Sequence, residues 1–185
     1  WMFESDFGSG LGAHGGVWEC PDLFPLTVEG TSTSKWILLV SLNCGPNGGT
    51  ATQYFVGDFD GKNFSVASNV TSWMDYGTDN YAGVTYNNIP SSDGRRILIG
   101  WMSNWSYAQN VPTTTWRSTM TVPRSLSLES TGVGYSLKSM PVSEVNNYLN
   151  TALDTTISGS FKSINFNDNK ILKTGSYQVV FSADL

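Results

Sequence analysis

The chain has 185 residues, with 10 basic and 15 acidic side chains and a formal net charge of −5. Its basic residues are scattered apart from the pair at 95–96, whereas a nucleic-acid partner requires a clustered basic face, so we expect no such partner. The longest apolar run, residues 36–40, is far too short to span a membrane, and a charged share of only 14 % argues against a long charged coiled coil.

Short β-type runs separated by turn residues dominate the chain. They predict strands over 35–42, 53–59, 63–66, 82–86, 95–102, 115–122 and 125–128. A helical pattern is confined to 142–149, where Pro141 suits the first turn and apolar residues fall near one face. Alternation resumes after residue 155. The sequence therefore predicts an all-β protein with one short linker helix.

The chain begins at Trp1 and stops at Leu185, directly after a strand-like run. A strand whose partners are absent leaves an open edge. We therefore expect the sequence to be a fragment of a longer all-β protein.

Two familiar motifs receive structural interpretations. Residues 10–15 match GxGxxG, but no strand–loop–helix context surrounds them, so we expect a loop and no nucleotide site. Residues 58–61 resemble the start of a calcium loop, yet the remaining ligand spacing is missing, which predicts a hairpin turn. His14 is the sole histidine, which excludes a multi-histidine metal site.

Glu19 is the first candidate for chemistry. It lies between Trp18 and Cys20, and an apolar neighbourhood favours the protonated form of a carboxyl group, as a proton donor requires. The alternative is an ordinary surface or structural glutamate.

A second group of candidates combines carboxylates with aromatic rings. Asp75 and Asp79 flank a glycine turn with Tyr81 nearby, as in a polyol site or simply in an Asp-rich turn. Trp101 and Trp105 crowd the end of a predicted strand, where they fit either core packing or a ligand cleft.

Three glycosylation sequons begin at Asn63, Asn69 and Asn104. Each alone is a weak signal, but together they favour a secreted, glycosylated chain. We therefore expect an extracellular protein.

Taken together, the motifs resemble those of glycoside hydrolase family 32, the invertases, inulinases and levanases. The resemblance covers roughly residues 5–150 and follows the family's order. The matching stretches are WECPDLF at 18–24, QYFVGDFDGKNF at 53–64, DYGTDNYAG at 75–83, RRILIGWMSNW at 95–105 and PTTTWRSTMTVPRSLSL at 112–128.

The resemblance implies a five-bladed β-propeller followed by a β-sandwich. On that basis we expect residues 1–140 to be the C-terminal part of the propeller, 141–154 a linker and 155–185 the start of the sandwich. In this family the sandwich often mediates oligomerisation, so a homo-oligomer of the full-length protein stays possible.

The resemblance also implies retaining chemistry on sucrose or β-fructans, with two carboxylates about 5–5.5 Å apart. Glu19 would be the general acid/base. Trp18 and Cys20 would lie beside it at the substrate, Asp75 would bind substrate hydroxyl groups, and Trp101 would line the fructose pocket. These steps need only carboxylates, so we expect neither a metal nor a cofactor.

One departure from the family pattern affects the expected activity. The family carries its nucleophile in an Asn-Asp-Pro motif and a transition-state-stabilising aspartate in Arg-Asp-Pro, and no Asp-Pro dipeptide occurs here. We therefore expect the 185-residue chain alone to be inactive. Two alternatives remain open, a non-catalytic fructan-binding module and a fructosyltransferase.

Overall fold

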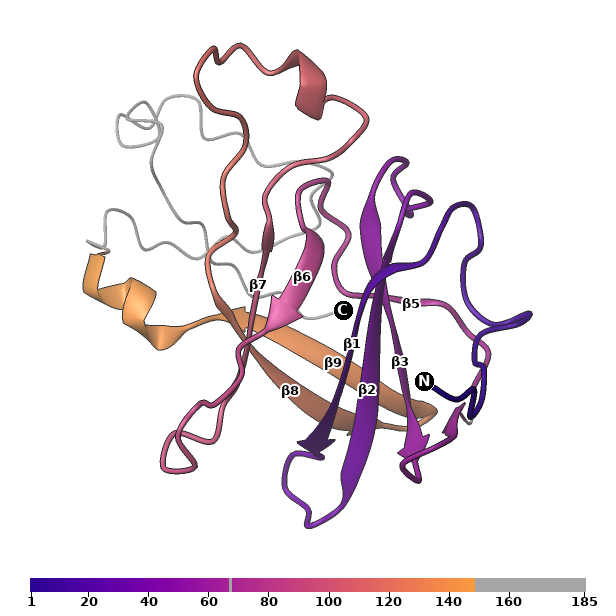
Figure 1. Ribbon diagram of the computed structural model, residues 1–185. Coiled ribbons are helices and arrows are strands. Elements are labelled where there is room, and N and C mark those ends of the chain that lie inside the picture. The colour runs from indigo at the N-terminus through magenta and orange to yellow at the C-terminus, as the bar shows by residue number, and fades with distance from the viewer. Residues whose placement is uncertain (67, 149–185) are drawn as a thin grey trace, which may run out of the picture. The chain divides into compact units, whose positions relative to one another are not determined.

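The predicted β-runs fold into two antiparallel sheets, shown in the computed structural model of Figure 1. The structure describes residues 1–66 and 68–148. The chain divides into two compact units, Trp1–Val142 and Ser143–Leu185, and both sheets belong to the first. The expectation of an all-β protein is confirmed for the described residues.

The first sheet is built from consecutive strands around an apolar centre. Its strands are β1 (Glu19–Thr27), β2 (Ser34–Leu42), β3 (Ala51–Phe59) and β4 (Phe64–Val66), with the short β5 (Ser72–Trp73) also paired to β3. The continuous apolar run of β2 is buried along most of its length, as expected for a strand covered on both faces.

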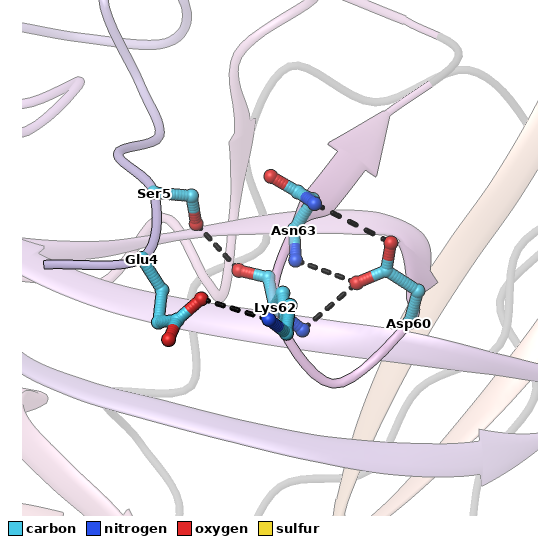
Figure 2. Close-up of polar contacts among 5 residues, drawn as sticks. All are labelled: Glu4, Ser5, Asp60, Lys62 and Asn63. Carbon is cyan, nitrogen blue, oxygen red and sulfur yellow. Dashed lines mark hydrogen bonds and ion pairs between the residues drawn. The ribbon is translucent and has the colours of Figure 1, made fainter. Parts of the chain in front are cut away.

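A tight turn joins β3 to β4, as the sequence predicts for residues 58–61 (Figure 2). Asp60 Oδ1 accepts hydrogen bonds from the backbone N–H groups of Lys62, at 2.8 Å, and Asn63, at 2.7 Å. Gly61 takes a φ of 94°, which only glycine adopts without strain. Glu4 pairs with Lys62 at 3.1 Å, so the N-terminal segment is attached to this turn.

The second sheet follows in chain order. Its strands are β6 (Tyr81–Thr85), β7 (Arg96–Trp101), β8 (Arg124–Thr131) and β9 (Gly134–Pro141). The sequence missed β1, β5 and β9 as strands. A 3₁₀ turn, η1 (Ala108–Asn110), lies in the long connection between β7 and β8.

The predicted strand over 115–122 is wrong. Ser118 adopts a φ of 64°, which interrupts an extended backbone, and Trp116, Met120 and Val122 are exposed. This segment contributes only an isolated bridge between Met120 and Trp101.

One hydrophobic core serves both sheets. Its buried members are Phe24, Val28, Ile37, Leu39, Tyr54, Met74, Leu98, Leu126, Leu128 and Leu137. Two polar contacts tie the sheets across this core: Glu29 N donates to Leu128 O at 2.8 Å, and Leu137 N donates to the Tyr54 hydroxyl at 3.2 Å. The sheets therefore hold a fixed relationship that positions the strand ends described below.

The second unit begins with η2, a 3₁₀ helix over Ser143–Tyr148. The helix predicted over 142–149 is thus present in its described part, but with the tighter 3₁₀ winding. The segment predicted as the start of a sandwich, 155–185, lies outside the described residues. Within the part of the chain that the structure describes, no helix is long and apolar enough to cross a membrane.

Candidate active site

Glu19 lies at the first position of β1, directly before a β-bulge. It pairs with Ser41 of β2, and the next paired residue is Asp22 with Leu39, so β1 contains one extra residue. Cys20 absorbs the bulge with a φ of 49°, a conformation that non-glycine residues rarely adopt. The bulge turns the exposed Glu19 out of the regular alternation of the strand.

Tyr81 has the equivalent place in the second sheet. It begins β6, pairs with Trp101 of β7, and is followed by the same one-residue bulge before Val84 pairs with Ile99. Ala82, like Cys20, takes a positive φ, here 51°. β1 and β6, which are far apart in sequence, therefore both start with a one-residue β-bulge that contains a positive-φ residue.

The two bulged strand starts meet through their side chains. The Tyr81 hydroxyl donates a hydrogen bond to Glu19 Oε2. Beside it, Ala82 N donates to Ser41 Oγ at 3.2 Å, and Ser41 shares a hydrogen bond with Thr52 at 3.1 Å. Glu19 is thus exposed to solvent yet held through one oxygen by the neighbouring sheet.

Tyr81 remains a hydrogen-bond donor throughout the physiological pH range. Its side chain is buried, with 3 % relative exposure. This desolvation raises the pKa of Tyr81 above its ordinary value, and the hydrogen bond to Glu19 and the charges of Glu19 and Cys20 raise it further. The phenol therefore keeps its proton and offers it to the carboxylate.

Asp75 is held by three donors. Its Oδ2 accepts from Arg124 at 2.8 Å and from Asn80 Nδ2 at 2.9 Å, and its Oδ1 accepts from Gly77 N at 3.0 Å. Asn80 directly precedes Tyr81, so Asp75 is connected to the Tyr81–Glu19 pair. Asp79 differs, because its buried Oδ1 accepts no hydrogen bond from any described residue.

An open aromatic pocket adjoins Tyr81. The Trp101 ring lies 6.3 Å from the Tyr81 ring and 4.8 Å from the Trp105 ring, measured between centroids. The pocket has a volume of about 440 Å³, and Gln109 and Arg117 add polar groups to its lining. Flat rings with hydrogen-bonding side chains between them suit a ligand with both C–H faces and hydroxyl groups.

A family comparison identifies the family of the chain that carries this arrangement. The model of the glycosyl hydrolases family 32 N-terminal domain matches residues 1–141. The chain belongs to glycosyl hydrolase family 32. The resemblance inferred from the sequence motifs is thereby confirmed.

Curated relatives within family 32 agree. The chain is 47 % identical to the levanase of Bacillus subtilis (strain 168) over 156 residues, which cover 82 % of this chain and 23 % of the levanase. It is 45 % identical to the extracellular exo-inulinase of Aspergillus niger over 140 residues, covering 70 % of this chain and 26 % of that protein. The chain thus spans about a quarter of the length of these relatives.

Solved family 32 structures show the same fold. The exo-inulinase of Aspergillus awamori superposes with a TM-score of 0.70 at 39 % identity, covering 76 % of this chain and 29 % of that one. The fructofuranosidase of Schwanniomyces occidentalis complexed with fructose gives a TM-score of 0.69 at 35 % identity, with coverages of 77 % and 28 %.

The residues singled out from the sequence fall into two groups in this family 32 chain. Glu19, Cys20, Asp75 and Trp101 are joined by contacts or chain neighbours around Tyr81. Trp18 instead packs in an aromatic cluster near the N-terminus: its Nε1 donates to Ala13 O at 2.8 Å and its ring contacts His14, Phe7 and Phe55. Its role at the substrate remains a prediction.

The prediction that Asn104 is a glycosylation site is not supported by its surroundings. Its side chain is only 1 % exposed, and Nδ2 donates to Thr50 O at 3.2 Å and Thr78 O at 2.9 Å. An amide nitrogen used in this way is not available to a glycan in the folded protein. Asn63 and Asn69 are exposed and stay candidates.

Sequence reasoning missed the roles of Tyr81 and Arg124. Tyr81 was noted only as an aromatic residue near a carboxylate, because the contact with Glu19 joins positions 62 residues apart. Arg124 carried no local signal of its contact with Asp75, which lies 49 residues earlier in the chain.

Proposed function

We propose that this chain forms part of a retaining fructan hydrolase and supplies its general acid/base, Glu19. The observation that carries the proposal is an exposed carboxylate held by the buried Tyr81 next to the Trp101–Trp105 pocket. The levanase and exo-inulinase names of the relatives support levan, inulin or sucrose as the substrate class.

In the proposed first step, Glu19 gives its proton to the glycosidic oxygen while the bond from that oxygen to the fructosyl carbon breaks. A nucleophilic carboxylate takes the fructosyl group as an ester. In the second step Glu19 removes a proton from water, whose oxygen replaces the carboxylate on the fructosyl carbon.

The nucleophile is the part of this scheme that the 185 residues lack, because they contain no Asp-Pro dipeptide. We therefore propose that the chain alone does not turn over substrate and that the full-length protein provides this group. The same lack favours the second candidate, a non-catalytic fructan-binding module. The third candidate function is transfer of the fructosyl group to a sugar hydroxyl, since the ester intermediate can react with either water or a sugar hydroxyl.

Substrate contacts are proposed for four further residues. Trp101 would pack against the sugar ring in the pocket, and Asp75, fixed by Arg124, would accept hydrogen bonds from hydroxyl groups. Cys20 follows Glu19 in the bulge and Trp18 precedes Glu19 in the chain, and this chain adjacency supports the proposal for both.

The architectural part of the proposal is that the two sheets are consecutive blades of a five-bladed propeller. Residues 1–140 would then be the propeller part, 141–154 the linker and 155–185 the start of the sandwich. Secretion with glycans at Asn63 and Asn69 is proposed from the exposed sequons and from relatives named extracellular. Homo-oligomers of the full-length protein would not conflict with this scheme.

The test compares Glu19→Gln with unchanged full-length protein on levan, inulin and sucrose. Loss of general acid catalysis lowers turnover by about 10²–10⁴-fold. Glu4→Gln is the matched control, since Glu4 is a surface carboxylate that pairs with Lys62 at the β3–β4 turn. Fructan binding without hydrolysis by the unchanged full-length protein would favour the binding module instead, and near-unchanged turnover in Glu19→Gln would remove Glu19 from the mechanism.

A further inference from the structure

Among the residues that the structure describes, the contact with Tyr81 engages one of the two Glu19 carboxylate oxygens and leaves the other without a hydrogen bond. The phenol donates to Oε2. A carboxyl group that gives up a proton needs its other oxygen free and directed to the substrate. The contact therefore distinguishes the two oxygens of Glu19 chemically.

Tyr81 is held firmly enough to impose this distinction. Its ring is buried and lies against Trp101, and the chain on either side is fixed by hydrogen bonds of Asn80 to Asp75 and of Ala82 to Ser41. Glu19, by contrast, is exposed and without such a contact would sample several rotamers. The rigid partner thus restrains the mobile one.

We infer that Tyr81 is a positioning residue that binds Glu19 through Oε2 and so makes Oε1 the oxygen that carries the transferred proton. This inference rests on the proposed function of Glu19 as general acid/base. Tyr81 itself exchanges no proton with the substrate.

The inference has a defined chemical consequence. In the first step the proton leaves Oε1 for the glycosidic oxygen, the bonding electrons stay on that oxygen, and the fructosyl carbon bonds to the nucleophilic carboxylate of the full-length protein. Glu19 becomes an anion, and the phenol donor stabilises the anion more than the neutral acid because hydrogen bonds to ionised groups are stronger. Tyr81 therefore favours proton release as well as the correct orientation.

Tyr81→Phe removes the phenol hydroxyl and none of the titratable side chains near this pair. They are Cys20 and Asp22 on β1, with Asp22 accepting from Thr85 N at 2.7 Å, and the Asp75–Arg124 pair reached through Asn80. The variant therefore tests the hydrogen bond between Tyr81 and Glu19.

The experiment measures kcat/KM of the full-length protein for sucrose and for fructosyl fluoride, whose fluoride leaves without a proton. The variants are Tyr81→Phe, Glu19→Gln, the double variant, and Tyr86→Phe as a control at an exposed tyrosine. We expect Tyr81→Phe to lower kcat/KM for sucrose by about 10–100-fold, because the variant loses a hydrogen bond to a charged group. For fructosyl fluoride, which needs no proton donor, we expect kcat/KM to change by less than about threefold.

The double variant decides whether Tyr81 acts through Glu19. If it does, Tyr81→Phe has less than about twofold effect in the Glu19→Gln background. Equal losses on both substrates, or the same loss in both backgrounds, would assign Tyr81 a structural or independent role and overturn the inference. Full activity of Glu19→Gln would overturn the proposed function of Glu19 as general acid/base. If Glu19→Gln is inactive and Tyr81→Phe is fully active, the proposed function stands and only the inference about Tyr81 is overturned.

Discussion

Gly49 lies directly against Asn104: a Cβ on Gly49 would be 2.2 Å from Asn104 Oδ1. Asn104 uses that closeness to join three loops. Its Oδ1 accepts from Thr50 N and from Ser106 Oγ, and its Nδ2 donates to the carbonyls of Thr50 and Thr78. The loops that follow β2, β5 and β7, including the one that carries Asp75, are therefore tied to one buried amide.

Replacing Asn104 with alanine should destabilise the protein by on the order of 2–4 kcal/mol, because buried backbone groups lose their partners. Thermal unfolding of the full-length protein measures the effect. Asn110→Ala serves as the control at an exposed asparagine. A midpoint equal to that of the control would contradict the role assigned to Asn104.

Gly49 and Gly48 offer a matched pair for the space around Asn104. Both have positive φ, 70° and 81°, so alanine at either site costs about 1–2 kcal/mol in the backbone. Only Gly49→Ala adds a clash, since a Cβ on Gly48 meets nothing within 4 Å. Gly49→Ala should therefore unfold at the lower temperature. Equal midpoints would show that the Asn104 amide can move aside at little cost.

Glycosylation is expected at Asn63 and Asn69 and not at Asn104. The protein should be secreted from a eukaryotic host and its tryptic glycopeptides analysed by mass spectrometry. Asn63 must release a weak contact, Nδ2 to Asp60 Oδ2 at 3.4 Å, before it can accept a glycan (Figure 2). A glycan on Asn104 in active, folded protein would contradict the burial described here.

Arg124→Gln should weaken the positioning of Asp75. The two side chains are partly buried, with 26 % and 28 % exposure, so loss of the ion pair leaves the carboxylate with neutral donors only. We expect a rise in KM for sucrose or fructan of several-fold in the full-length protein. Arg95→Gln, which removes the ion pair with Asp93 and lies outside the pocket lining, provides the comparison. An unchanged KM in Arg124→Gln would indicate that Asp75 does not bind substrate.

Acid stability should depend on Asp93. The hydrogen bonds and charge of Arg95 lower the pKa of Asp93 from 3.8 to about 2. A carboxyl group with a depressed folded-state pKa contributes stability above its unfolded pKa, and that contribution is lost as the pH falls from about 4 through about 2. Asp93→Asn should flatten the fall in unfolding temperature over this window. An identical pH profile for both proteins would contradict the assignment.

The strands predicted from continuous apolar runs, such as β2 and β3, are present because burial on both faces leaves a strong signal in sequence. β1 left no such signal, since Pro21 and Pro25 interrupt it and the Glu19 bulge shifts its alternation. Residues 115–122 show the reverse error. Their alternation suits a strand, but the positive φ of Ser118 depends on tertiary contacts with β7.

In the candidate site, too, local sequence signals could be read and contacts that depend on the fold could not. Glu19, Asp75 and Trp101 could be selected because their motifs are local and match those of a family. The hydrogen-bond partner of Glu19 could not, because Tyr81 reaches it only after two separate sheets have packed together. The burial of Asn104 was equally hidden, because a sequon records three neighbouring residues and carries no information on burial.

The joint between the two sheets also sets the order in which the chain can mature. The backbone of Val28 and Glu29 at the end of β1 meets Leu128 of β8, far later in the sequence. During synthesis β1, β2 and β3 emerge well before β8, and domains form as their segments leave the ribosome. The hydrophobic core that Phe24 and Ile37 share with Leu126 and Leu128 can therefore close only after β8 has been synthesised.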